Sequence, residues 1–259
     1  MKKRLDLLVV ERGLAESRAR AQAYIMEGRV RAGDRVLSKA GESVDEATPL
    51  TLAQPETSYV GRGGEKLAHA LDAFALDPIG LVALDVGAST GGFTDVLLRR
   101  GARRVYAVDV GYGELAWSLR ENPSVVVIER TNIRYLERLP EEPDLATIDV
   151  SFISLDKVLP AVWRLVGDEG RVVALIKPQF EAGRGQVGKG GIVRDPSTHR
   201  LVLERALAFA AAGGWLLGGL IDSPIRGRSG NREFLALWSK TPPDTPVAPE
   251  AAIERVMAK

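Results

Sequence analysis

The stretch 81–109 constrains the fold of this chain more than any other. An apolar run, Leu81–Val86, predicts a β-strand that ends at a glycine-rich loop, Gly87–Gly92. A helical pattern follows, and then a second apolar run, Val105–Val108, which ends in the acid Asp109. Two strands joined by a helix, with a glycine loop after the first, predict a ligand-binding crevice at the carboxyl ends of the strands.

The loop favours a cationic ligand over a dinucleotide. It reads Gly-x-x-x-Gly-Gly, with Ser89 where the dinucleotide fingerprint has its second glycine. Asp85 precedes the loop, and a carboxylate there would repel a pyrophosphate. S-adenosylmethionine carries an ammonium and a sulfonium but no phosphate, and Asp109 is placed to bind its ribose hydroxyls. We therefore expect this cofactor to contact Asp85, Gly87, Ala88, Ser89, Thr90, Gly91, Gly92, Phe93, Asp109, Asn132 and Asp149.

Composition is consistent with one α/β domain and a smaller one. The 259 residues are 45% hydrophobic and 27% charged, as in ordinary soluble proteins. No apolar stretch reaches the ~18 residues of a membrane-spanning helix, and the first residues lack the apolar core of a signal peptide. We therefore expect a cytoplasmic protein without membrane contact. The chain has no cysteine and two histidines, which excludes disulfides and argues against a histidine metal site, so no metal is expected.

Residues 1–58 are expected to form a small basic domain. The first 40 residues hold ten Lys/Arg against five Asp/Glu, although the whole chain carries a net charge of only +1. This asymmetry indicates a polyanionic partner. Apolar residues at helical spacing precede Gly13, Ser17 is a good N-cap for a second helix, and two short β runs turn at Gly33-Asp34.

The N-terminal pattern resembles a known RNA-binding module. It runs from Arg4-Leu-Asp through Gly13-Leu-Ala-Glu-Ser-Arg18 to Ile25-Met-Glu-Gly-Arg29-Val. This pattern is similar to the small domain first seen in ribosomal protein S4, an α+β domain. The resemblance implies that the basic face of the helix pair binds structured RNA.

A larger body follows a glycine-rich linker, which we place at residues 59–65. From residue 66 to 240, runs of strand and helix character alternate and close in an expected hairpin of 215–221 and 233–239. This alternation predicts an α/β fold with a doubly wound, mostly parallel, Rossmann-like sheet. Residues 241–259 are expected to form a proline-rich tail with one weak helix.

Four charged residues stand out in this body: Lys66, Asp149, Lys177 and Glu233. Asp149 and Lys177 are expected to end adjacent strands and therefore to lie within reach of each other. They belong to motifs that read Gly61-Arg-Gly-Gly-Glu-Lys66, Asp85-Val-Gly-Ala-Ser-Thr-Gly-Gly-Phe-Thr, Asp149-Val-Ser-Phe-Ile-Ser-Leu, Lys177-Pro-Gln-Phe-Glu and Gly230-Asn-Arg-Glu233-Phe. With these motifs the chain resembles the FtsJ-like ribose 2′-O-methyltransferases, and with its N-terminal domain it resembles the TlyA (haemolysin A) family.

The resemblance implies 2′-O-methylation of a cytidine in ribosomal RNA by a lysine–aspartate–lysine–glutamate tetrad. A ribose hydroxyl is a poor nucleophile until its proton leaves, and a lysine can take that proton where burial and a second cation depress its pKa. We assign Lys177 as the base and Asp149 as its orienting partner, with Lys66 and Glu233 positioning the ribose. RNA or a ribosomal subunit is the expected partner, and the cations expected to bind it are Lys3, Arg4, Arg18, Arg20, Arg29, Arg31, Arg62, Arg184 and Lys189.

Three other functions remain as alternatives. A dinucleotide-dependent oxidoreductase is disfavoured by Asp85 and Ser89. A membrane-lytic protein, which the haemolysin name suggests, would need an apolar or strongly amphipathic segment, and we find neither. A non-catalytic RNA-binding or assembly factor would not need the four charged residues. The sequence leaves the target nucleotide and the oligomeric state open.

Overall fold

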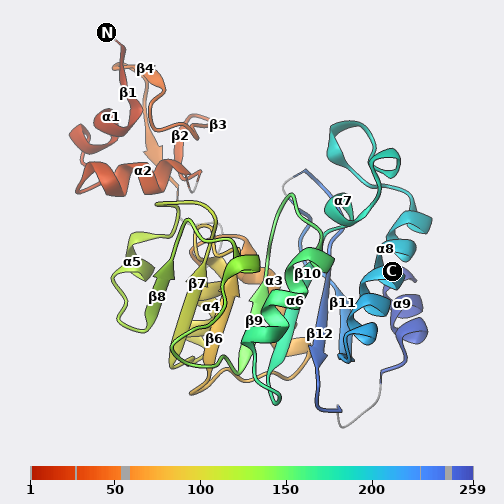
Figure 1. Ribbon diagram of the computed structural model, residues 1–259. Helices are drawn as coiled ribbons and strands as arrows, with labels where there is room; N and C mark the ends of the chain where they lie inside the picture. Colours follow the sequence, from red (N-terminus) through yellow and green to blue (C-terminus); the bar gives the residue numbers. More distant parts are fainter. Residues whose placement is uncertain (1, 27, 54–58, 228, 243–246, 259) are drawn as a thin grey trace.

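The computed structural model describes residues 2–26, 28–53, 59–227, 229–242 and 247–258, without the side chains of Met26 and Arg184. A small N-terminal domain stands on a larger α/β body (Figure 1). The elements of the N-terminal domain are β1 (Lys2–Arg4), α1 (Leu5–Glu11), α2 (Arg18–Met26), β2 (Val30–Ala32), β3 (Arg35–Val36), β4 (Ser43–Asp45) and β5 (Thr51–Leu52).

The two N-terminal helices form as the sequence predicts. Ser17 Oγ accepts a hydrogen bond from the backbone N–H of Arg20 (3.2 Å), which confirms its capping of α2. The apolar faces of α1 and α2 bury Leu5 and Ile25 completely. Strands β2 and β3 pair antiparallel across a turn in which Gly33 has a φ of 61°, a conformation that favours glycine.

The body contains a seven-stranded sheet flanked by helices. Its strands are β6 (Val82–Val86), β7 (Arg104–Val108), β8 (Val125–Ile128), β9 (Leu145–Ile148), β10 (Arg171–Ile176), β11 (Leu216–Asp222) and β12 (Phe234–Ser239). Its α-helices are α3 (Gly63–Ala73), α4 (Gly92–Arg99), α5 (Trp117–Arg120), α6 (Leu155–Leu165), α7 (Pro178–Glu181), α8 (Pro196–Ala212) and α9 (Pro249–Met257). Short 3₁₀ turns occupy Ile133–Tyr135, Arg184–Gln186 and Lys189–Gly191.

The expected doubly wound sheet is confirmed. The strand order is β11-β12-β10-β9-β6-β7-β8, and β10, β9, β6, β7 and β8 run parallel. The last two strands, β11 and β12, pair antiparallel with each other, as the expected hairpin requires. The parallel strands have helices on both faces, and β6 and β10 consist mainly of buried apolar residues, as strands covered on both faces require.

Alternate residues of each strand serve two separate cores. On β6, Val82 and Leu84 face a core shared with α6, α8 and α9, whereas Ala83 faces a core shared with α3 and α4. Side chains alternate across a strand, so each strand supplies both layers. In α9, Ile253 and Val256 are buried against the first core, so the expected weak helix of the tail is packed into the body.

All five parallel strands end at one edge of the sheet. The register pairs Val86 with both Val108 and Ile148, so the residues that follow these strands lie side by side. The N-terminal domain and the loop around residues 183–191 stand above this edge on opposite sides (Figure 1). Among the helices that the structure describes, none has the length and apolar character that crossing a membrane demands.

The expected linker is partly folded into the body. Helix α3 begins at Gly63, inside the linker expected at residues 59–65, and Val60 N–H donates to Asp95 of α4 (2.9 Å). A Cβ on Gly92 would lie 3.0 Å from the backbone nitrogen of Gly64. The absence of a side chain at Gly92 therefore permits the close approach of α4 to the segment 61–64.

Candidate active site

The glycine loop after β6 adopts a conformation that its residues favour. Gly87 and Gly91 have φ values of 85° and 98°, and Ser89 has a φ of 46°. A Cβ on Gly87 would lie 2.5 Å from the backbone oxygen of Asp149, so only glycine fits between the ends of β6 and β9. The loop therefore brings the residue after β9 against the residue after β6.

Asp109 holds this loop from the neighbouring strand. One carboxylate oxygen accepts a hydrogen bond from the Ser89 N–H (2.8 Å), and the other accepts one from the Gly111 N–H (2.7 Å). Ser89 Oγ in turn lies 3.2 Å from the Glu114 carboxylate. The acid expected to bind ribose thus lies beside the loop, as predicted, and also fixes its shape.

Asp85 lies beneath the loop and does not reach the cavity described next. Its side chain is fully buried and accepts hydrogen bonds from the hydroxyls of Thr94 (2.6 Å) and Thr147 (3.0 Å). Burial raises the pKa of the Asp85 carboxyl to about 7, because the charged form loses its hydration. The structure therefore does not bring Asp85 into direct reach of a ligand, and gives it a role in anchoring α4 and β9.

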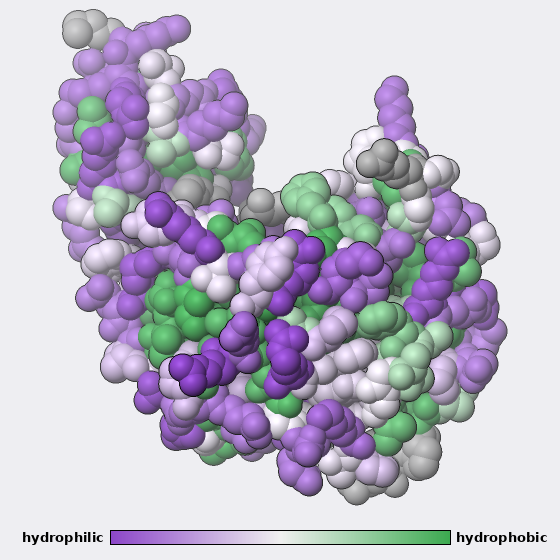
Figure 2. Space-filling model, viewed as in Figure 1, coloured by the Kyte–Doolittle hydropathy of each residue, from purple (hydrophilic) through white to green (hydrophobic). Residues whose placement is uncertain are grey.

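A cavity of about 900 Å³ opens above the strand ends. It is lined by the loop residues Gly87–Thr90, the joint 59–63 and the inner face of the N-terminal domain. Figure 2 shows the hollow between the N-terminal domain and the body. Of the expected cofactor residues, Gly87, Ala88, Ser89, Thr90, Gly92, Phe93 and Asp149 line this cavity.

Asn132 lies at the neighbouring strand end, after β8. Its side-chain oxygen accepts a hydrogen bond from the Arg134 N–H (3.1 Å) and so caps a short 3₁₀ turn. Neither Asn132 nor Asp109 is part of the cavity wall as the described residues define it. Both lie near the loop, and their contact with a cofactor stays a prediction.

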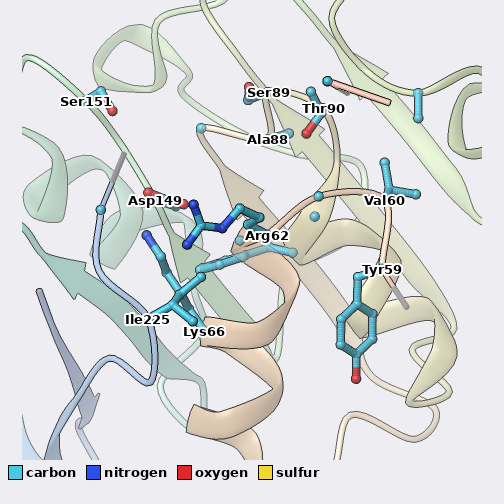
Figure 3. A pocket seen from close by; sticks show the side chains of 18 of the residues that line it. Tyr59, Val60, Arg62, Lys66, Ala88, Ser89, Thr90, Asp149, Ser151 and Ile225 are labelled. Atoms are coloured by element: carbon cyan, nitrogen blue, oxygen red, sulfur yellow. The ribbon is translucent and has the colours of Figure 1, made fainter. Parts of the chain in front are cut away.

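The tetrad is assembled as two ion pairs that line the same cavity. Lys66 Nζ lies 2.6 Å from Glu233 Oε2, and Lys177 Nζ lies 2.5 Å from Asp149 Oδ1. Lys66, Lys177 and Glu233 are buried and Asp149 is partly exposed. Figure 3 shows Lys66 of α3 and Arg62, the residue before α3, extending toward the side of the cavity where Asp149 lies. The expected proximity of Asp149 and Lys177 is confirmed, with adjacent parallel strands as its cause.

Three further residues shape the tetrad, and the sequence did not indicate their roles. Ser151 Oγ accepts a hydrogen bond from Lys177 Nζ (3.0 Å), and Gln179 donates one to Glu233 Oε1 (3.1 Å). A Cβ on Gly227 would lie 2.4 Å from Glu233 Oε1, so any other residue there would displace the Glu233 carboxylate or the turn. Ser151 and Gln179 occur in the motifs that begin at Asp149 and Lys177. Their place in these motifs was the sign in the sequence by which they could have been identified.

Phe152 is a further cavity residue that sequence reasoning missed. Its side chain is 90% exposed, its φ is 62°, and its ring centroid lies 5.0 Å from that of Phe180. Positive φ is rare for an aromatic residue and marks a strained backbone, which tends to occur at functional sites. Exposure of an aromatic side chain depends on the tertiary fold, so no sequence pattern indicated it.

The cations expected to bind RNA divide into two groups. Arg20, Arg29, Arg31 and Arg62 line the cavity. Three of the others form ion pairs: Lys3 with Glu11 (2.5 Å), and Arg4 and Arg18 with buried Asp6 (3.0 and 2.9 Å). Lys189 is exposed on the loop after α7. The side chain of Arg184 lies outside the described residues. RNA binding by these residues stays a prediction.

Asp6 explains why two basic residues, Arg4 at the end of β1 and Arg18 at the start of α2, lie together. Its carboxylate is fully buried and accepts hydrogen bonds from Arg4, Arg18 and Gln22. These donors, led by Arg4, hold the pKa of the Asp6 carboxyl well below its usual range. Arg4 and Arg18 therefore stabilise the N-terminal domain, whatever else they bind.

A glycine loop at the strand ends of a doubly wound sheet defines a protein of the Rossmann-like class, with its ligand site at those strand ends. A family model for FtsJ-like methyltransferases matches residues 59–240, and a model for the S4 domain matches residues 3–48. The chain belongs to the FtsJ-like methyltransferase family, with an S4 domain at its N-terminal side.

Full-length relatives carry two kinds of description. The chain is 45% identical to the 16S/23S rRNA (cytidine-2′-O)-methyltransferase TlyA of Mycobacterium tuberculosis, over 99% of this chain and 97% of the relative. It is 41% identical to Hemolysin A of Brachyspira hyodysenteriae, over 90% and 98%. A solved structure from Streptococcus thermophilus, described as a candidate hemolysin, is 46% identical with a TM-score of 0.76, over 99% and 94%. The expected kinship with the TlyA family is thereby confirmed.

Proposed function

We propose that this protein transfers the methyl group of S-adenosylmethionine to the 2′-hydroxyl of a cytidine ribose in ribosomal RNA. The observation that carries the proposal is that two ion pairs, Lys177–Asp149 and Lys66–Glu233, line one cavity beside the glycine loop. Family membership and the TlyA relative of Mycobacterium tuberculosis support the same reaction.

The residues around the loop suit this cofactor. Asp109 and Asp149 place carboxylates at the loop, where they can bind hydroxyls and cationic groups but would repel a phosphate. The cavity of about 900 Å³ can hold a nucleoside-sized ligand together with part of a substrate. When bound, the cofactor supplies a methyl group that is already activated by its sulfonium, so the protein needs only to prepare the hydroxyl.

Lys177 is placed to take the proton of the ribose hydroxyl. Lys177 follows β10 and is buried. Its amine contacts the Asp149 carboxylate and donates a hydrogen bond to the Ser151 hydroxyl. A neutral amine in this position can accept the proton as the new carbon–oxygen bond forms. Lys66 and Glu233 form the second ion pair of the same cavity, and Gln179 donates a hydrogen bond to the other oxygen of Glu233. Alignment of the hydroxyl with the methyl group supplies much of the rate.

Phe152 and the N-terminal domain provide surfaces for the RNA. An exposed aromatic ring next to the tetrad offers a face on which a nucleobase can stack once it leaves its own helix. Arg20 and Arg29 flank the Tyr24 ring at 5.0 and 4.2 Å on the cavity wall of the N-terminal domain. RNA that spans the hollow can therefore meet cations on one side and the tetrad on the other.

The deciding experiment is a methyl-transfer assay with mapping of the product. Ribosomal subunits and free rRNA that lack the modification are incubated with the protein and S-adenosylmethionine labelled in its methyl group. We expect label in RNA at a cytidine 2′-oxygen, and transfer at least ~10²-fold slower in a Lys177→Ala variant. Label that appears on a base, or transfer at near the parental rate in Lys177→Ala, would contradict the proposal.

A further inference from the structure

Two buried polar side chains outside the tetrad hold the base of the loop 183–193, which we call the arm. Asn231 is 1% exposed and His199 is 5% exposed. The arm projects above the strand ends (Figure 1), and a Cβ on Gly185 or Gly190 would meet nothing within 4 Å. Among the described residues of the arm, Gly185 and Gly190 therefore stand clear of the body, whereas Gly191 and Val193 at its base are fastened.

Three hydrogen bonds fasten the base of the arm. Asn231 Oδ1 accepts one from the Val193 N–H (2.9 Å), and Asn231 Nδ2 donates one to the Gly191 carbonyl (2.9 Å). His199 Nε2 lies 3.1 Å from the Val193 carbonyl. Because a carbonyl oxygen only accepts, this ring nitrogen carries the proton. Both backbone polar groups of Val193 are thus satisfied by buried side chains.

Asn231 also connects to the wall that holds Glu233. Its backbone carbonyl accepts a hydrogen bond from the Gly227 N–H (3.0 Å), and Gly227 packs directly against the Glu233 carboxylate. Glu233 itself follows two residues later in the chain. One buried residue therefore joins the base of the arm, the glycine turn and the strand that carries a member of the tetrad.

We propose that Asn231 is a positioning residue that fixes the arm relative to Glu233. RNA bound by Lys189 of the arm is thereby presented to the tetrad. This inference rests on the proposed function. Lys189 is exposed on the arm and is the cation that the arm offers among residues 185–191. Without the Asn231 amide, the arm still carries Lys189 but is no longer held at a fixed position relative to the cavity.

The test is a double-mutant cycle between Asn231→Ala and Lys189→Ala. We expect each single change to raise the KM for rRNA by roughly tenfold, the scale of one or two lost hydrogen bonds or a lost phosphate contact. In the Asn231→Ala background, Lys189→Ala should add little, because the unfastened arm no longer presents the lysine. The affinity for S-adenosylmethionine should stay unchanged, since Asn231 does not line the cavity.

Arg20→Ala on the N-terminal domain is the matched control, and its effect on the KM should multiply with that of Asn231→Ala. If the effects of Lys189→Ala and Asn231→Ala on the KM also multiply fully, the proposal is overturned, because Asn231 would then have a role in stability alone. If Asn231→Ala does not fold, His199→Phe removes one of the three bonds and enters the same cycle.

A second readout does not depend on methylation. Trypsin should cleave the bond after Lys189 roughly tenfold faster in Asn231→Ala than in the parent, because the released arm opens more often. Equal cleavage rates would overturn the fastening role even if no rRNA is methylated. Absence of methylation by the parent protein, with faster cleavage in the variant, would instead contradict the proposed function and leave the fastening role intact.

Discussion

Lys177 Nζ lies 2.5 Å from Asp149 Oδ1, where β10 and β9 end side by side. The contact is local in space but joins residues from two separate βα units. Because the strands are parallel, with Ala174 of β10 paired to Ile148 of β9, the residues that follow them lie at the same edge of the sheet. We expect the chemistry to depend on this contact.

Replacement of Lys177 tests whether this residue takes the proton. Lys177→Ala should keep the fold and the cofactor affinity but lose ~10²–10⁴-fold in transfer rate, the usual scale for a lost general base. Lys177→Arg should not restore activity, because a guanidinium stays protonated. Single-turnover transfer of labelled methyl to rRNA measures both. Near-parental activity in Lys177→Arg would leave the residue with a purely electrostatic role.

Asp109 should contribute to cofactor affinity. Asp109→Ala removes the acceptor for the Ser89 and Gly111 N–H groups, and with it a hydroxyl-binding carboxylate. We expect S-adenosylmethionine binding to weaken by about 1–3 kcal/mol in a calorimetric titration. Asp77→Ala is a matched control, because Asp77 also accepts a backbone N–H two residues on (3.0 Å) but lies before the opposite edge of the sheet. Equal effects of the two variants would contradict this role of Asp109.

The N-terminal domain should supply most of the RNA affinity. A truncated chain that begins at Tyr59 retains the contacts of Tyr59 and Val60 with α4, and should still bind cofactor while losing rRNA methylation. Binding of the whole chain to rRNA should weaken with salt, by roughly 0.7–0.9 log units per log unit of salt for each phosphate neutralised. The measurement is filter binding across a salt series, and a truncated chain that methylates normally would refute the assignment.

Gly227 should be needed for the geometry of Glu233. Gly227→Ala would place a methyl group 2.4 Å from Glu233 Oε1, so the carboxylate has to move away from Lys66 or the turn has to open. We expect kcat to fall by roughly tenfold or more, with cofactor affinity retained. Gly41→Ala is the control, because its Cβ would meet Arg4 at an ordinary contact distance of 3.5 Å. Unchanged kcat in Gly227→Ala would show that Glu233 tolerates displacement.

Asp85 should make stability depend on pH in a direction opposite to most carboxylates. Its pKa is 3.8 in the unfolded chain and about 7 in the fold, so the folded state binds the extra proton. Its contribution to stability is therefore fully present below about pH 4 and is lost as the pH rises through about 7, a change on the order of 4 kcal/mol. Asp85→Asn cannot ionise, so the stability of the parent relative to this variant should fall from pH 4 to pH 8. Parallel unfolding curves across that range would refute the burial effect.

The sequence by itself determined the framework of the catalytic body. The strands β6, β7 and β9 and the glycine loop follow from local chemistry: apolar runs that suit buried parallel strands, and glycines where φ is positive. The cap at Ser17 and the turn at Gly33 are local in the same sense. The motif resemblance named the four charged residues before their positions in space were known.

Only the tertiary structure decided how those residues are paired and which surfaces they share. Lys66 and Glu233 are 167 residues apart, and no pattern of spacing relates them. The inward direction of Asp85, the use of Arg4 and Arg18 by Asp6, and the exposure of Phe152 depend likewise on contacts between distant elements. Periodicity and turn chemistry act over a few residues, whereas burial and ion pairing are set when the sheet brings remote segments together.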